Sequence, residues 1–475
     1  MTGKSAVWLS LNCRNMSEKV RLRRIEYPEY PSPAKVAPPT AEELSGRILK
    51  VREAMRGAGL THLVVYGDRE HFANLAYLTN YDPRFEEALL VLGDSGTPLL
   101  LVGNEGVGHL GVSALYNSEA LRYERFQTFS LMNQPKEDSR SLESIFIDEG
   151  IGQEAMVGVV VWKYYPELPD STGVSDAPAY IWNSLCRLSK NVVNSTDLMI
   201  SPSYGLRSRL SVYEIALFEF SNIMASGAVR AILENLRPGL TDFELMSKVP
   251  FTGYPFSCHP SVKSSGNSHY GLSSPTGDVI EEGKSCSMSV AYWGSNVCRA
   301  GWVVKDESGL PPEAKDYVGS FAAPFFLAVR HWLKELRIGT QGRVLYDIIA
   351  NDLPFAKFGV YLNPGHLIHY DEWLSSPIYK DSTETIESGM CVQIDIIPRS
   401  KEYSSVRMEE GVVVADLPLR ERLRNEYPDV YDRCMRRRAF MEELGFELPE
   451  ELLPLSDLAG VIPPFLLDKN LVLSL

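Results

Sequence analysis

In the first 200 residues, apolar and polar positions alternate between the period of a helix and that of a strand. Residues 41–56 carry apolar side chains at helical spacing, behind a Thr40 that can cap the helix and a Glu43 placed to complete a capping box. The next apolar segments, one helical and three short enough for strands, are residues 72–78, 62–66, 88–92 and 98–102. Helices that alternate with buried strands predict an α/β domain.

The pattern changes in the second half of the chain. Capping-box sequences at 211–214 and 241–244 open two helices, and the first of these is long and amphipathic. Residues 285–304 alternate as two strands about a turn, and residues 390–415 predict another strand pair. Helices laid over a curved antiparallel sheet are an α+β arrangement.

These changes of pattern predict four parts. The second boundary lies near Ser201 and Pro202, which interrupt the periodic pattern. The last part begins as a charged helix and continues as an apolar tail that contains prolines. The predicted parts are an N-terminal arm (1–39), an α/β domain (40–200), an α+β domain (201–419) and a C-terminal helix and tail (420–475).

Composition and charge narrow the class of protein. The 475 residues are 44% hydrophobic and 23% charged, with a net charge of -14, which disfavours nucleic acid and anionic membranes as partners. The seven cysteines include no CxxC pair, so we expect reduced thiols rather than a disulfide framework. We see neither a signal peptide nor an apolar stretch that approaches a bilayer span, and we therefore expect a cytoplasmic protein.

Six segments resemble, in order, the creatinase/aminopeptidase P/methionine aminopeptidase family. The resemblance covers about residues 40–415 and implies a C-terminal catalytic domain of the pita-bread fold, with a smaller creatinase-type α/β domain before it. It also implies a homodimer in which the N-terminal domain helps to close the partner's site. The segments are YLTNY (77–81), the helical region 206–245, SSGNSHYG (264–271), NPGHLIH (363–369), ESGMCVQIDIIP (387–398) and VRMEEGVVV (406–414).

The resemblance implies two metal ions held by two Asp, one His and two Glu. It places the first Asp near Ser289 and the second at 298–300, yet no Asp or Glu occurs between residues 283 and 304. We therefore expect no two-metal centre and no other cofactor, although three ligands could hold a single divalent metal. The residues at the three remaining ligand positions are His366, Asp395 and Glu409.

Loss of the metals need not end the chemistry, since creatinase itself, by the same resemblance, hydrolyses a C–N bond without metal. His269 matches its catalytic His, which would move protons, with His366, Asp395 and Glu409 completing the catalytic set. Arg299 is a candidate for neutralising these carboxylates, and Arg407 shares a strand face with Glu409. The candidates for binding substrate are Glu372, Tyr292 and, from the partner subunit, Arg84 and Phe85. Each of these residues also has a plain structural interpretation, such as a core residue or a surface ion pair.

Three functions are compatible with this pattern. The first is a metal-independent, creatinase-like hydrolase of a C–N bond in a small amidine, guanidino or amide substrate. The second is a lyase on the same fold with a single metal. The third is a non-catalytic binding or regulatory protein, which a cavity filled by Trp293 or Trp302 would favour. A true aminopeptidase is disfavoured, because its metal-activated water would lack a two-metal cradle.

Overall fold

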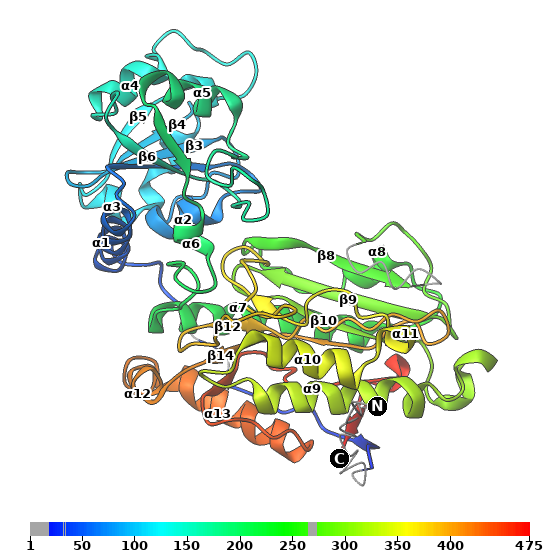
Figure 1. Cartoon of the computed structure of the whole chain (residues 1–475). Coiled ribbons are helices and arrows are strands. Elements are labelled where there is room, and N and C mark those ends of the chain that lie inside the picture. The colour runs from blue at the N-terminus through cyan, green and yellow to red at the C-terminus, as the bar shows by residue number, and fades with distance from the viewer. Residues whose placement is uncertain (1–18, 32, 34, 265–272) are drawn as a thin grey trace, which may run out of the picture.

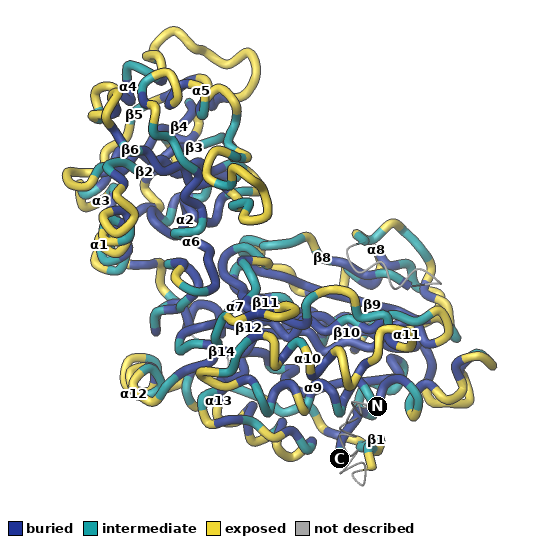
Figure 2. Tube along the Cα trace, viewed as in Figure 1, coloured by how far each residue is buried: buried dark blue, intermediate teal, exposed yellow. Residues whose placement is uncertain are grey.

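The chain forms two bodies of α+β structure (Figures 1 and 2). One hydrophobic cluster runs through both bodies, and each body has a further buried cluster of its own. The structure is a computed structural model that describes residues 19–31, 33, 35–264 and 273–475. The smaller body is formed by the N-terminal half, and the larger by the C-terminal half together with both ends of the described chain (Figure 1). The α+β architecture with a smaller α/β body is the one that the sequence predicted.

The N-terminal body is built on a mixed sheet of six strands in the order β5-β4-β3-β2-β6-β7. Its central strands are buried, and the strand β2 pairs antiparallel with β3 and parallel with β6. The strands are β2 (His62–Gly67), β3 (Ala88–Gly93), β4 (Leu99–Val102), β5 (Arg122–Arg125), β6 (Met156–Val160) and β7 (Asn191–Asn194). The helices are α1 (Ala41–Gly57), α2 (Ala73–Thr79), α3 (Ala114–Asn117), α4 (Leu142–Asp148), α5 (Ala179–Leu188) and α6 (Asp197–Ile200).

The C-terminal body holds two antiparallel sheets of four strands. The first has the order β13-β10-β9-β8 and the second β11-β12-β14-β15. The first sheet comprises β8 (Phe256–Ser264), β9 (Ser285–Tyr292), β10 (Val297–Trp302) and β13 (Arg407–Glu409). The second comprises β11 (His366–Leu367), β12 (Cys391–Gln393), β14 (Gly411–Val414) and β15 (Leu452–Pro454). A further pair joins the two ends of the described chain: β1 (Arg21–Arg24) and β16 (Leu471–Ser474).

The strand pair predicted at 390–415 is confirmed, because β12 pairs antiparallel with β14, but a third strand, β13, lies between them in the sequence and joins the other sheet. β13 pairs with β10, whereas β14 pairs with β12, so the chain passes from one sheet to the other at Glu410. The backbone N–H of Ile394 donates to the carbonyl of Glu410 at 3.0 Å, next to this crossing. The crossing brings one end of each sheet together, and the candidate site lies there.

Helices cover the two sheets. α7 packs against β9 and β10, and α9 packs against α10. By length and composition alone, α7 could span a membrane, contrary to the expectation from the sequence. However, 67% of its most apolar segment of 18 residues is buried inside the protein. The helices are α7 (Val212–Asn235), α8 (Asp242–Met246), α9 (Ala323–Glu335), α10 (Gly342–Asp352), α11 (Phe355–Phe358), α12 (Leu417–Glu426) and α13 (Pro428–Glu443).

The capping boxes predicted at 211–214 and 241–244 are both present, and the one at Thr40 is half formed. The N–H of Glu43 donates to Thr40 Oγ1 at 3.2 Å, but the carboxylate of Glu43 instead accepts a hydrogen bond from Ser211 Oγ at 3.0 Å. Beside this contact, Arg47 of α1 pairs with Glu214 of α7 at 3.1 Å. The ends of two predicted helices thus connect the two bodies through buried polar contacts.

We predict that Glu219→Gln strongly destabilises the C-terminal body. Glu219 accepts hydrogen bonds from Arg433 through both carboxylate oxygens, each at 2.7 Å, and lies 2.8 Å from Arg437 Nη1. Loss of its charge leaves two buried guanidinium groups without that counter-charge, which should lower the free energy of unfolding by about 3–5 kcal/mol. Urea denaturation measures this change.

The matched control is Glu234→Gln in the same helix. Glu234 pairs with Arg230 on the surface, and its loss should cost less than about 1 kcal/mol. Equal and small effects of the two substitutions would contradict the stabilising role of the Glu219 pairs.

Candidate active site

Three side chains on neighbouring strands form one row on the first sheet of the C-terminal body. The register places Ser289 on β9 opposite Cys298 on β10, and Cys298 opposite Glu409 on β13. Opposed residues of paired strands project from the same face of a sheet. Ser289 and Cys298 therefore stand in one row with the Glu409 ligand position, where the resemblance implied two Asp.

His366, Glu372 and Asp395 face this row from the second sheet. His366 begins β11 and pairs with Gln393 of β12, and Asp395 follows the end of β12. His366 Nε2 lies 3.4 Å from Glu372 Oε1 and 3.9 Å from Asp395 Oδ2. The turn between β9 and β10 ties the two groups together, because Asn296 Nδ2 donates to Glu409 Oε1 at 2.7 Å and to Glu372 Oε1 at 3.2 Å. The structure thus brings together four residues that the sequence named as site candidates: His366, Glu372, Asp395 and Glu409.

A cavity of about 540 Å³ opens onto this cluster. Its polar floor holds the row of Ser289, Cys298 and Glu409, and Trp373 stacks on the His366 ring at 4.1 Å between ring centroids. Two polar atoms beside it, His366 Nε2 and Asp395 Oδ1, are buried and make no hydrogen bond to a described residue. The remaining lining residues are Cys258, Ser273, Asn296, Tyr361, Leu362, Glu372, Asp395, Ile397, Arg399 and Arg407.

The carboxyl groups of the cluster differ in their readiness to ionise. Burial, together with the charge of Glu372, raises the pKa of Asp395 to about 6, although His366 and Arg407 oppose the shift. Burial and the charges of Asp395 and Glu372 raise the pKa of Glu409 well above its ordinary value. Burial would also raise the pKa of Glu372, but the charge of His366 and the Asn296 hydrogen bond lower it. Glu372 is therefore the carboxylate that stays ionised.

His366 is the proton donor that this arrangement provides. Burial alone would lower its pKa, but the charges of Glu372 and Asp395 and a contact with the Leu367 carbonyl raise it. His366 Nδ1 lies 3.1 Å from that carbonyl oxygen, which accepts only if Nδ1 carries the hydrogen. The proton at Nε2 then faces Glu372, which lines the cavity, whereas His366 itself is fully buried and does not line it.

Two cationic side chains line the cavity, Arg399 and Arg407, and Arg299 is not one of them. Arg299 lies on the opposite face of β10, where its Nη2 is 2.7 Å from Glu410 Oε2. Arg407 lines the cavity, and its Nη1 donates to Cys298 Sγ at 3.7 Å. The sequence placed Arg407 on the same strand face as Glu409 but gave it no role. The alternation of side chains along a strand predicts the face of the sheet on which a residue lies, but it does not predict which side chain that residue contacts.

The donors present do not fit a bridged pair of metal ions. The Ser289 hydroxyl and the Cys298 thiol stand where two carboxylates are implied, so these positions lack the carboxylate oxygens that bridge two hard cations. The guanidinium of Arg407 beside them repels a further cation. Among the described residues one group of possible ligands remains, with its ligand atoms all within 4.8 Å of one another: His366, Asp395 and Glu409.

Other predicted residues lie elsewhere. His269 falls in 265–272, outside the described residues. The structure does not bring Tyr292 to the cavity, because it is buried in the core and stacks on Phe256. Arg84 donates to the Phe256 carbonyl at 2.7 Å and Phe85 is 59% exposed, so neither lines the cavity of its own chain. A role for these two residues in a partner's cavity stays a prediction.

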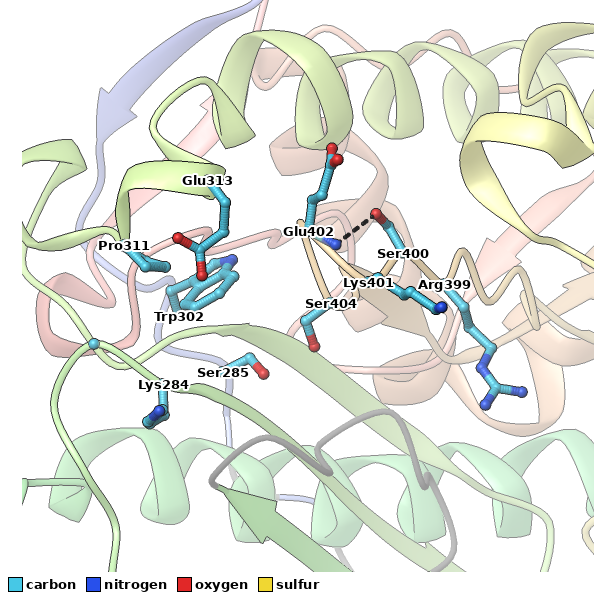
Figure 3. A pocket seen from close by; sticks show the side chains of 11 residues that line it. Lys284, Ser285, Trp302, Pro311, Glu313, Arg399, Ser400, Lys401, Glu402 and Ser404 are labelled. Atoms are coloured by element: carbon cyan, nitrogen blue, oxygen red, sulfur yellow. Dashed lines mark hydrogen bonds between the residues drawn. The ribbon is translucent and has the colours of Figure 1, made fainter.

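A second cavity of about 540 Å³ adjoins Arg399, which lines both cavities (Figure 3). Figure 3 shows Glu313 and Trp302 on one side of this second cavity and Ser285 below Trp302. Its lining contains no His or Cys. Trp293 stacks on Phe72 and Tyr370, and neither Trp293 nor Trp302 lines the first cavity.

We predict that Asp395→Asn stabilises the chain at neutral pH. The pKa of Asp395 is about 6 in the folded chain, against an ordinary value near 4 in the unfolded chain. Ionisation of Asp395 therefore lowers the free energy of unfolding, fully above about pH 6 and no longer below about pH 4. The substitution should raise the free energy of unfolding at pH 7.5 by on the order of 2 kcal/mol, and by little at pH 4. Denaturant titrations at both pH values, with exposed Asp347→Asn as control, measure the difference. A gain that is the same at both pH values would contradict the prediction.

Comparison with known proteins identifies the fold. No family model matches the chain, and no curated protein matches its sequence. Solved structures do match it. The prolidase from Pyrococcus horikoshii has a TM-score of 0.60 at 14% identity, over 78% of this chain and 95% of that one. The Xaa-Pro dipeptidase from Bacillus anthracis gives 0.59 at 16%, over 78% and 95%, and aminopeptidase P from Escherichia coli gives 0.51 at 14%, over 80% and 94%. The chain therefore has the two-domain pita-bread fold of the prolidases and aminopeptidase P.

Proposed function

We propose that this chain is a creatinase-like hydrolase that cleaves a C–N bond in a small substrate without a bridged metal pair. The observation that carries the proposal is the pairing of the buried His366 with Glu372, which lines together with Asp395 a cavity where Ser289 and Cys298 stand at the implied metal-ligand positions. A proton donor and a proton acceptor with pKa values shifted toward neutrality are what C–N hydrolysis requires.

The described residues support a simple division of roles. Asp395 takes a proton from water as the water oxygen attacks the substrate carbon, since a pKa of about 6 leaves it ionised at neutral pH and still basic. His366 Nε2 gives its proton to the leaving nitrogen as the C–N bond breaks, and Glu372 holds the imidazolium in place. After the products leave, the proton returns from Asp395 Oδ2 to His366 Nε2, 3.9 Å away, through an intervening water. His269 remains the sequence candidate for a second proton shuttle.

The cavity also supports a class of substrate. Its volume of about 540 Å³ suits a small molecule, and three acidic side chains meet on one side of it. An amidine, guanidino or protonated amine group would pair with the ionised Glu372, and its C–N carbon would then lie beside Asp395 and His366. The proposed substrates are therefore small molecules with a cationic nitrogen group next to the bond that is cleaved.

A second candidate function is a lyase of the same fold that uses a single divalent ion. The observation that favours it is the closeness of three possible ligands: the ligand atoms of His366, Asp395 and Glu409 all lie within 4.8 Å of one another. One imidazole and two carboxylates form a set of donors that such an ion accepts. Bound iron or zinc at these three residues would favour this alternative, and the ion would then supply Lewis-acid chemistry.

We expect the purified full-length chain to release ammonia or amine from a panel of guanidino, amidine and amide compounds, with and without EDTA. The turnover should be unaffected by EDTA, and His366→Gln should lower kcat by about 10²- to 10⁴-fold, because the proton donor is lost. The matched control is His331→Gln, since the half-exposed His331 contacts Asp352 far from the cavity lining. Turnover that needs added metal, or that survives His366→Gln undiminished, would contradict the proposal.

A further inference from the structure

Arg407 differs from the other buried arginines of the described chain. Seven arginines are buried, and six of them lie within ion-pair distance of a carboxylate. Arg407, 4% exposed, has no such partner among the described residues, and residues 265–272, which the structure does not describe, contain no Asp or Glu. The six paired arginines are Arg47, Arg207, Arg299, Arg433, Arg437 and Arg438.

The described residues make no hydrogen bonds that would satisfy both terminal nitrogens of the Arg407 guanidinium. Nε donates to Ser405 Oγ at 3.4 Å, and Nη1 donates to Cys298 Sγ at 3.7 Å. Nη2 makes no hydrogen bond to a described residue, and each Nη carries two hydrogens. The edge formed by Nη1 and Nη2 is the one that binds a carboxylate through two parallel hydrogen bonds.

The surroundings of Arg407 explain why this charge has no internal partner. Arg407 lies on β13, two residues before Glu409. It contacts Cys298, which lies in the segment 298–300 where the family resemblance implies a metal-binding Asp. The side chains that replace those ligands, Ser289 and Cys298, carry no negative charge. A guanidinium buried without a counter-charge costs free energy, which an anion from solution would offset.

We propose that Arg407 forms an anion subsite of the cavity, which binds the carboxylate group of a small ligand. The neutral Ser289 hydroxyl and Cys298 thiol line the same cavity and do not repel an anion there. The charges of Asp395 and Glu409 lie nearby but outside ion-pair distance of the guanidinium. An external carboxylate can therefore take a place that no described carboxylate fills.

Together with the proposed function, on which this step rests, the subsite narrows the substrate to a small zwitterion. Its cationic nitrogen group would lie against Glu372, and its carboxylate would lie against Arg407. The anion subsite itself does not depend on catalysis. It is a property of the cavity that binding experiments can test on their own.

The test compares acetate with its neutral counterpart acetamide on the full-length chain. Saturation-transfer NMR follows the methyl signal of each compound, at an ionic strength matched with sodium chloride. Acetate should bind saturably and acetamide should not. Arg407→Gln should weaken acetate binding by about tenfold or more, because a charge-assisted pair is lost, and Arg407→Lys should restore part of it. The matched control is Arg399→Gln, which lines the same cavity and should change acetate binding by less than about twofold.

Equal binding of acetate and acetamide, or loss of acetate binding in Arg399→Gln but not in Arg407→Gln, would overturn the subsite. If Arg407→Gln does not fold, as judged by circular dichroism, wild-type crystals soaked in sodium acetate decide: density for two oxygens on the Arg407 guanidinium supports the subsite, and its absence there overturns it. Failure here is distinct from failure of the proposed function. Turnover of substrates without acetate binding would remove only the subsite, and acetate binding without turnover would remove only the hydrolase.

Discussion

Ser289, Cys298 and Glu409 lie opposite one another on three adjacent strands, and the chemistry of the cavity is arranged around this row. Because the register of a sheet fixes which side chains share a face, the row cannot point elsewhere without breaking the pairing of β9, β10 and β13. Only one of its three members can carry a negative charge at neutral pH. The negative charge available to hold cations is therefore confined to the Glu409 end of the row and to the residues that face it from the second sheet.

This confinement gives the cavity a fixed distribution of charge. The ion pair of His366 with Glu372 lies on one side. Burial raises the pKa of both Asp395 and Glu409, and the negative charge of Asp395 raises the pKa of Glu409 further, which favours the state in which one of the two is protonated. Arg407 supplies a permanent positive charge on the other side. In this pita-bread cavity, the guanidinium of Arg407 provides positive charge where metal ions would otherwise provide it. We propose that such a cavity uses proton transfer by side chains rather than activation of water by metal.

Much of this could be predicted from the sequence, and the failures have physical causes. The capping boxes that begin at Ser211 and Thr241 are local signals, and the structure contains both. The cluster of His366, Asp395 and Glu409 was found through motif order. The box at Thr40 failed in part because Glu43 has a competing long-range partner in Ser211. The isolation of Arg407 could not be predicted, since it depends on distances to carboxylates of two different sheets.

The central claim is that the side chains of this cavity cannot hold two bridged metal ions. Its most direct test is the metal content of the purified full-length chain, measured by mass spectrometry after equilibration with excess manganese or zinc and removal of free ions. With only His366, Asp395 and Glu409 as a ligand group among the described residues, the account predicts at most one ion per chain. Two ions per chain, bound stoichiometrically, would contradict it.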